Sequence, residues 1–248
     1  MKIKPMVSFM ILLVLASCQE EDVKEKNINE LGFQTFQSEW NTSSLKSNIV
    51  KNNKKACYLF SGEKVNDLLN NPETHTFRFV LGLTNNKLDL KTQSVDRSGK
   101  NVGWINSSLY SDKVFDNALE RLSDSNHEFS VDNSSAGQHL LESSKAVGYI
   151  QQWNRKLSEN EDLTSVVSFD NQRIRYFSIE KEVVNDIAHF NSFKYLGIFL
   201  GINPEGKLTT ILVGFDGNEN IILPSSSGNE NNAGAVYDFT RPCPNTCR

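Results

Sequence analysis

Two stretches of this chain carry matching residues, so the same small unit of structure is expected to form twice. Val65-Asn66-Asp67-Leu68 matches Val184-Asn185-Asp186-Ile187, and Leu81-Gly82-Leu83 matches Leu200-Gly201-Ile202, both at an offset of 119 residues. Further matches lie at 113 (Trp40-Asn41 with Trp153-Asn154), at 117 (Phe60-Ser61-Gly62-Glu63-Lys64 with Phe177-Ser178-Ile179-Glu180-Lys181) and at 120 (Asp96 with Asp216). The offset only rises along the chain, as small insertions in one copy would cause. The sequence therefore predicts an internal duplication.

Each copy predicts a strand, then a helix, then a β-hairpin. Short apolar stretches at residues 56–60 and 174–177 are typical of strands. Ser61 and Ser178 are expected to cap the helices that follow, because a serine oxygen can accept a hydrogen bond from a first-turn amide. The hairpins are expected over residues 77–96 and 196–215, where Asn, Pro and Gly at the tips favour tight turns.

The predicted fold class is α+β, with two tandem strand-helix-hairpin repeats, antiparallel sheet and joining helices. Amphipathic helices over residues 112–122 and 145–157 are expected between the hairpins of the two copies. The expected segments are a signal peptide (1–17), a polar tether (18–31), repeat 1 (32–104), a helix and polar linker (105–144), repeat 2 (145–224) and a polar tail with a cysteine pair (225–248).

The N-terminus predicts export and a lipid anchor on Cys18. Lys2 and Lys4 precede an apolar run, and Leu15-Ala16-Ser17-Cys18 places two small residues before a cysteine. The run of about ten residues is shorter than the roughly 20 that cross a membrane. LASC resembles the lipobox of lipoprotein signal peptidase, which implies a mature chain that starts at Cys18 and carries acyl chains such as palmitate. The alternative is an ordinary secretory peptide with an incidental cysteine.

The residues after Cys18 bear on localisation. Gln19-Glu20-Glu21-Asp22 is similar to the surface-export signal of lipoproteins in Bacteroidota, which implies display at the cell surface. The alternative location is the periplasmic face of the outer membrane. In both cases the polar residues up to about Glu30 are expected to form a solvated tether.

The charge balance argues against one class of partner. Without residues 1–17 the chain has 24 basic and 30 acidic residues, a net charge of −6. Nucleic-acid binding depends largely on Lys and Arg that meet phosphates, so no nucleic-acid partner is expected. The expected partners are the membrane, through Cys18, and an envelope protein or glycan.

The other three cysteines have separate expectations. Cys243 and Cys247, separated by three residues, are expected to close a small disulfide loop in an oxidising compartment. A zinc site, which needs about four ligands, is the alternative, and a redox pair would normally be Cys-x-x-Cys. Cys57 matches Ile174 in the second copy, so we expect it to be a buried free thiol.

The sequence contains no motif that identifies a reaction, a metal or a cofactor. His75, His127, His139 and His189 share no ligand spacing. Residues 216–220 (Asp-Gly-Asn-Glu-Asn) begin like a calcium loop, but the sixth position is isoleucine and the twelfth is serine, where glycine and glutamate are required. A turn after a strand is therefore expected there, and catalytic residues stay unidentified.

The second half of the chain resembles a group of Bacteroidota lipoproteins with no assigned activity. The resemblance covers residues 145–247 and, more weakly, residues 55–96. It is carried by the hairpin from Leu200-Gly201-Ile202 through Lys207-Leu208 to Val213-Gly214-Phe215-Asp216-Gly217, and by Pro242-Cys243-Pro244-Asn245-Thr246-Cys247. It implies a lipid-anchored envelope protein and supplies no catalytic residue.

Two main classes of function fit these observations. The first is a non-catalytic lipoprotein that binds or scaffolds a partner at the outer membrane, since an anchor and a duplicated unit are predicted without a catalytic motif. The second is a hydrolase acting on envelope or extracellular polymers, with carboxylates such as Asp96 and Asp216 in a cleft. A toxin-neutralising or stress-type envelope lipoprotein is a third possibility.

Overall fold

The structure is a computed structural model that describes residues 34–43, 55–85, 87–111, 113–124, 137–159, 162–223, 236–238 and 240–244. The signal peptide, Cys18, the tether, His127 and Cys247 lie outside the described residues, so the expectations about them stay predictions. The fold is α+β, as predicted, and its sheets are antiparallel. No helix among the described residues is long and apolar enough to cross a membrane.

Strand, helix and hairpin follow one another twice along the chain. The first series is β1 (Ala56–Ser61), α2 (Gly62–Asn70), β2 (Thr76–Thr84) and β3 (Lys87–Val95). The second is β8 (Tyr176–Glu180), α5 (Lys181–Ala188), β9 (Tyr195–Ile202) and β10 (Leu208–Phe215). The two helices begin 119 residues apart, and so do β2 and β9. The elements thus recur in the same order at spacings of 119 to 121 residues. Descent from a duplication stays a prediction.

The two series exchange their first strands. β1 pairs with β9 in a four-stranded sheet of order β10-β9-β1-β5, and β8 pairs with β2 in a five-stranded sheet of order β11-β8-β2-β3-β4. The added strands are β4 (Asn101–Asn106), β5 (Ser108–Ser111) and β11 (Arg241–Cys243). The register is the same in both sheets, because Phe60 lies opposite Leu196 and Ile179 lies opposite Phe77. Each sheet needs strands from both series, so we infer that the two series fold together.

β8, the first strand of the second series, begins two residues later than predicted. Phe177 and Ile179 both face the core, and this alternation extends β8 to Glu180. The predicted cap at Ser178 is therefore wrong, because Ser178 lies inside β8 and Glu180 precedes α5. Ser61 does occupy the N-cap position of α2, but its side chain makes no capping hydrogen bond.

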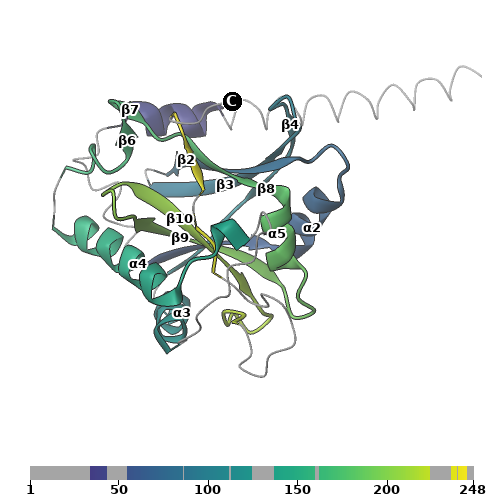
Figure 1. The fold of residues 1–248 in the computed structure, drawn as a ribbon. Coiled ribbons are helices and arrows are strands. Elements are labelled where there is room, and N and C mark those ends of the chain that lie inside the picture. Colours follow the sequence, from purple (N-terminus) through teal and green to yellow (C-terminus); the bar gives the residue numbers. More distant parts are fainter. Residues whose placement is uncertain are drawn as a thin grey trace, which may run out of the picture.

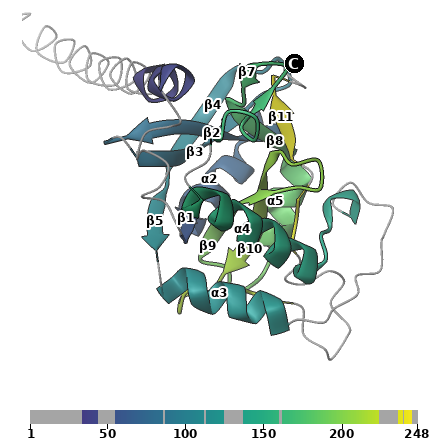
Figure 2. The same cartoon turned by 90° about the vertical axis from the view of Figure 1, so that its left-hand side faces the viewer.

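The molecule is layered, with its main core between the two sheets (Figures 1 and 2). The inner face of the four-stranded sheet contributes Tyr58 and Phe60 to this core, and the five-stranded sheet contributes Phe79 and Phe177. A second core lies on the other face of the four-stranded sheet, where α3 (Lys113–Asp124) and α4 (Ser143–Ser158) pack. These are the two amphipathic helices that the sequence predicted, slightly extended.

A short helix over residues 34–42 covers one end of the outer face of the five-stranded sheet. Figure 2 shows this purple helix beside the strands of the five-stranded sheet, on the side away from α3. Phe36 in this helix packs on Gly82 of β2, where an added Cβ would lie 2.1 Å from the phenyl ring. The helix covers the hairpin end of β2 and β3, and the other end of the same face carries the candidate site. Smaller elements complete the fold: the 3₁₀ turn η2 (Gly137–His139), β6 (Ser168–Phe169) and β7 (Gln172–Arg173).

Candidate functional site, an arginine-lined pocket

A pocket of about 510 Å³ opens on the outer face of the five-stranded sheet. Its lining comes from the start of β2, the end of β3 with the turn that follows, β8 and β11. The lining residues are His75, Thr76, Arg78, Val95, Asp96, Arg97, Gly99, Tyr176, Ser178 and Arg241. Three of the ten are arginines, and they come from parts of the chain that are distant in sequence.

Strand register brings two of these arginines together. Arg78 of β2 lies opposite Ser178 of β8, and Ser178 lies opposite Arg241 of β11. Side chains alternate between the two faces of a strand, so this row points outward while Phe77 and Phe177 point into the core. The row therefore places a hydroxyl between two guanidinium groups on the open face.

Arg78 and Arg241 are each held by neighbouring groups. The Arg78 guanidinium lies 4.7 Å from the ring centroid of Tyr176, and its Nη1 donates a hydrogen bond to the Gly99 carbonyl at 3.3 Å. Arg241 Nη2 lies 2.5 Å from Glu180 Oε1. These contacts limit the motion of both side chains and orient them before any ligand arrives.

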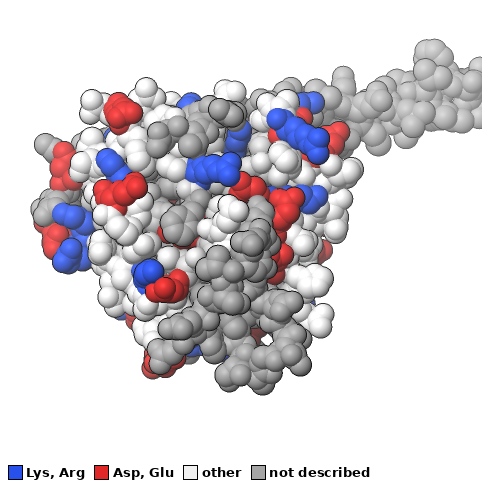
Figure 3. All heavy atoms as spheres, in the orientation of Figure 1, with Lys and Arg blue, Asp and Glu red and all other residues white. Residues whose placement is uncertain are grey.

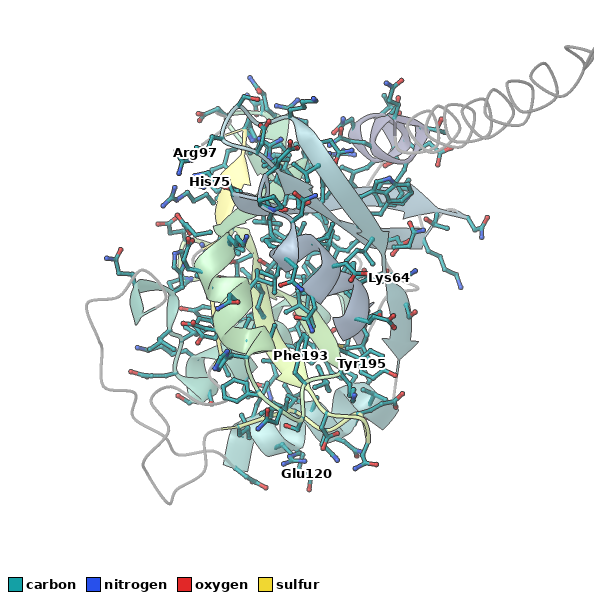
Figure 4. The ribbon with its side chains drawn as sticks, turned by 90° about the vertical axis from the view of Figure 1, so that its right-hand side faces the viewer. Lys64, His75, Arg97, Glu120, Phe193 and Tyr195 are labelled. Carbon is teal, nitrogen blue, oxygen red and sulfur yellow. The ribbon has the colours of Figure 1, made fainter. Side chains whose placement is uncertain are left out.

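Arg97 projects from the turn after β3. Asp96 Oδ1 accepts hydrogen bonds from the Ser98 amide at 2.8 Å, the Ser98 hydroxyl at 2.7 Å and the Lys100 amide at 2.9 Å. The Ser98 hydroxyl bond, followed by the amide bond from Lys100, lowers the pKa of Asp96. The carboxylate is thus engaged by its own turn, and Arg97 is exposed at the rim. Figure 4 shows Arg97 beside His75, at the end of the molecule opposite Glu120.

Glu180, beneath Arg241, also contacts a buried histidine. Its Oε2 lies 3.1 Å from His139 Nε2, and His139 Nδ1 lies 3.1 Å from the carbonyl oxygen of Asp238. A carbonyl can only accept, so Nδ1 carries a hydrogen in this geometry. Glu180 thus lies between Arg241 and His139, and Asp96 is the carboxylate that lines the pocket itself.

The carboxylates proposed for hydrolysis do not meet in the pocket. Asp96 lines it, but Asp216 does not and lies in the turn after β10, in the other sheet. Asp216 Oδ1 accepts hydrogen bonds from the amides of Asn218 at 2.8 Å and Asn220 at 2.9 Å. Partial burial opposes the effect, yet the hydrogen bonds from Asn220 and Asn218 lower the pKa of Asp216. The structure has a turn here, as the sequence predicted.

The cysteines and histidines do not form a metal site among the described residues, where no group of three or more His, Cys, Asp or Glu side chains comes together. Cys57 is a buried free thiol, as predicted, and burial raises its pKa. Cys243 is disulfide-bonded, but the pairing with Cys247 stays a prediction because Cys247 lies outside the described residues. His189 is exposed.

The sequence did not identify the pocket. Arg78 could have been found as a charged residue on the wet side of a strand, between the core residues Phe77 and Phe79. Arg241 could not, because β11 is a three-residue strand in a tail that reads as polar loop. Comparison of the chain with family models, curated proteins and solved structures finds no match, so its function is argued from this geometry.

Proposed function

We propose that this protein is a non-catalytic, lipid-anchored binding protein of the bacterial envelope, and that the arginine-lined pocket is its binding site. The observation that carries the proposal is the convergence of Arg78, Arg97 and Arg241 on one pocket of about 510 Å³. Guanidinium groups present several N–H donors in a fixed plane, which suits the oxygens of carboxylate, sulfate and phosphate groups. The ligand is therefore an oxyanion, carried by an envelope molecule.

The arrangement of the lining side chains favours binding over chemistry. The Ser178 hydroxyl donates to the Arg241 carbonyl at 3.3 Å, so it is engaged by the backbone of β11. The Asp96 carboxylate is engaged by its own turn, as described above. A hydrolase would need a nucleophile or a water-activating base aimed into the pocket, and the hydroxyl of Ser178 and the carboxylate of Asp96 are both engaged by structural partners instead.

The lipid anchor completes the proposal. Cleavage before Cys18 and acylation of its thiol would hold the mature chain at the outer membrane, at the cell surface or on the periplasmic face. Replacing Cys18 with alanine is expected to move the protein from the membrane fraction to the soluble fraction, or to stall its maturation. A Cys18→Ala protein of wild-type size that stays in the membrane fraction would refute the anchor.

The binding site is tested by titrating the unlipidated chain, without residues 1–17 and with Cys18→Ser, with phosphate, sulfate and acetate. Saturable binding of at least one anion is expected, and Arg97→Gln should weaken it. Arg155→Gln is the matched control, because Arg155 is an exposed arginine of α4, the helix packed against the other sheet. Absence of binding by all three anions would refute the site, as would equal binding by the Arg97→Gln and wild-type chains.

A further inference from the structure

The helix over residues 34–42 and the pocket lie on the same face of the five-stranded sheet. The helix over residues 34–42 is the first described segment after the tether, and its Phe36 and Trp40 are both buried. Trp40 Nε1 donates to the Ile174 carbonyl at 2.7 Å. Arg173 Nη1 donates to the carbonyl oxygens of Trp40 and, at 2.9 Å, of Ser43. The helix is therefore fixed to the body of the protein.

Lys91 strengthens this attachment. Its Nζ lies 4.4 Å from the ring centroid of Phe36 and 4.7 Å from that of Trp104, so the ammonium group contacts two aromatic faces. Desolvation lowers the pKa of Lys91, opposed by the charge of Asp89. The helix that follows the tether in sequence is thus fixed on the outer face of the five-stranded sheet.

A lipid anchor on Cys18 would keep this face within a short reach of the membrane. Sixteen residues, 18–33, separate the predicted lipidated cysteine from the helix. A chain of that length spans at most about 55 Å, from roughly 3.5 Å per residue. A short linker of this kind raises the effective concentration of a tethered site to about the millimolar range. A pocket with low affinity for its ligand would therefore still be occupied at the membrane.

We propose that the pocket binds the phosphate group of an anionic lipid in the membrane that anchors the protein, with the five-stranded sheet facing that membrane. This rests on the proposed function. Guanidinium groups pair readily with the oxygens of a phosphodiester headgroup. Arg97 and Arg241, which are both exposed, would make first contact, and the partly buried Arg78 would bind deeper in the pocket.

The overall charge makes this inference specific. The mature chain has a net charge of −6, so an anionic bilayer repels the protein as a whole. Figure 3 shows basic and acidic side chains interspersed over the face it displays. Attraction to anionic vesicles must therefore come from a local group of arginines, and removing them should abolish it.

The test uses the unlipidated chain described above in a flotation assay. Vesicles of phosphatidylcholine alone are compared with vesicles that also contain phosphatidylglycerol. Binding is expected only to the second kind. Arg97→Gln should lower the partition coefficient about fivefold, since each basic residue near a membrane raises that coefficient by about this amount. The double variant Arg97→Gln with Arg241→Gln should therefore lower the partition coefficient about thirtyfold. Arg155→Gln should change nothing, and inorganic phosphate should compete.

The outcomes separate this inference from the proposed function. Saturable binding of soluble anions without binding to phosphatidylglycerol vesicles would leave the binding site standing and overturn the lipid assignment. Equal binding to both kinds of vesicle would overturn it too, as would arginine variants that float like the wild-type chain. Thermal unfolding of each variant shows that a loss of binding is not a loss of fold.

Discussion

The two sheets use equivalent positions for different purposes. The strand register relates Leu59 of β1 to Ser178 of β8 and Gly197 of β9 to Arg78 of β2, each pair 119 residues apart. In the four-stranded sheet Leu59 is buried, and the outward side is covered by α3 and α4. In the five-stranded sheet Ser178 and Arg78 line the pocket.

The neighbouring strands show the same contrast. Ile211 and Val213 of β10 are fully buried under α3 and α4, whereas the corresponding Lys91 and Gln93 of β3 are only partly buried. Among the described residues, two helices occupy one outer face and one short helix occupies one end of the other. The same strand pairing therefore supports an apolar core on one side of the molecule and an open polar face on the other.

The largest expected effect comes from truncating the covered face. Leu59→Ala removes a buried side chain from the core between the four-stranded sheet and its helices, and should cost about 2–5 kcal/mol of the free energy of unfolding. Ser178→Ala, at the equivalent position, should change that free energy by no more than about 0.5 kcal/mol. Urea denaturation of both variants measures the difference. Equal losses of stability in the two variants would mean that the outer faces of the two sheets do not differ in burial.

A smaller loss of stability is expected from substituting the two glycines on which a helix packs, Gly201 and Gly82. An added Cβ at Gly201 would lie 2.9 Å from Tyr149 Cβ and 3.2 Å from the Tyr149 backbone carbonyl carbon in α4. Gly201→Ala should therefore cost about 1–3 kcal/mol of the free energy of unfolding. At the equivalent Gly82 the three atoms nearest to the added Cβ all belong to the ring of Phe36 in the short helix.

Gly82→Ala should displace the short helix and leave the sheets intact. The expected result is faster proteolysis near residues 34–43, with a change in the midpoint of thermal unfolding smaller than that of Gly201→Ala. A Gly82→Ala variant that loses more stability than Gly201→Ala would show that the short helix is integral to the core.

The smallest effect is expected at the turn after β10. The pKa of Asp216 is lowered in the folded state, so its contribution to stability is complete above the unfolded pKa of about 3.9 and is lost as the pH falls through the lower folded value. Asp216→Ala should cost about 1 kcal/mol or less at pH 7, because the turn is partly exposed and its hydrogen bonds are screened. Thermal unfolding should show this difference at pH 7, and the wild-type and variant midpoints should converge as the pH falls through the lowered folded pKa.

Local patterns in the sequence predicted the elements, while pairing between distant strands decided the site. The alternation of Leu88, Leu90 and Thr92 with charged residues indicated β3, and the apolar spacing of Val65 and Leu69 indicated α2, because both signals lie within one element. That β8 would pair with β2 has no local signal, since about 100 residues separate them. The pocket depends on that pairing and on β11, so the sequence alone did not reveal it.

The central claim, that the open face of the five-stranded sheet binds an oxyanion, is tested most directly by nuclear magnetic resonance. Phosphate would be titrated into the unlipidated chain while backbone amides and arginine Nε–H signals are followed. The account predicts saturable shifts at Arg78, Arg97, Gly99, Ser178 and Arg241, with none at the equivalent Gly197 and Leu59. Shifts of equal size in both sheets, or none in the pocket at saturating phosphate, would contradict it.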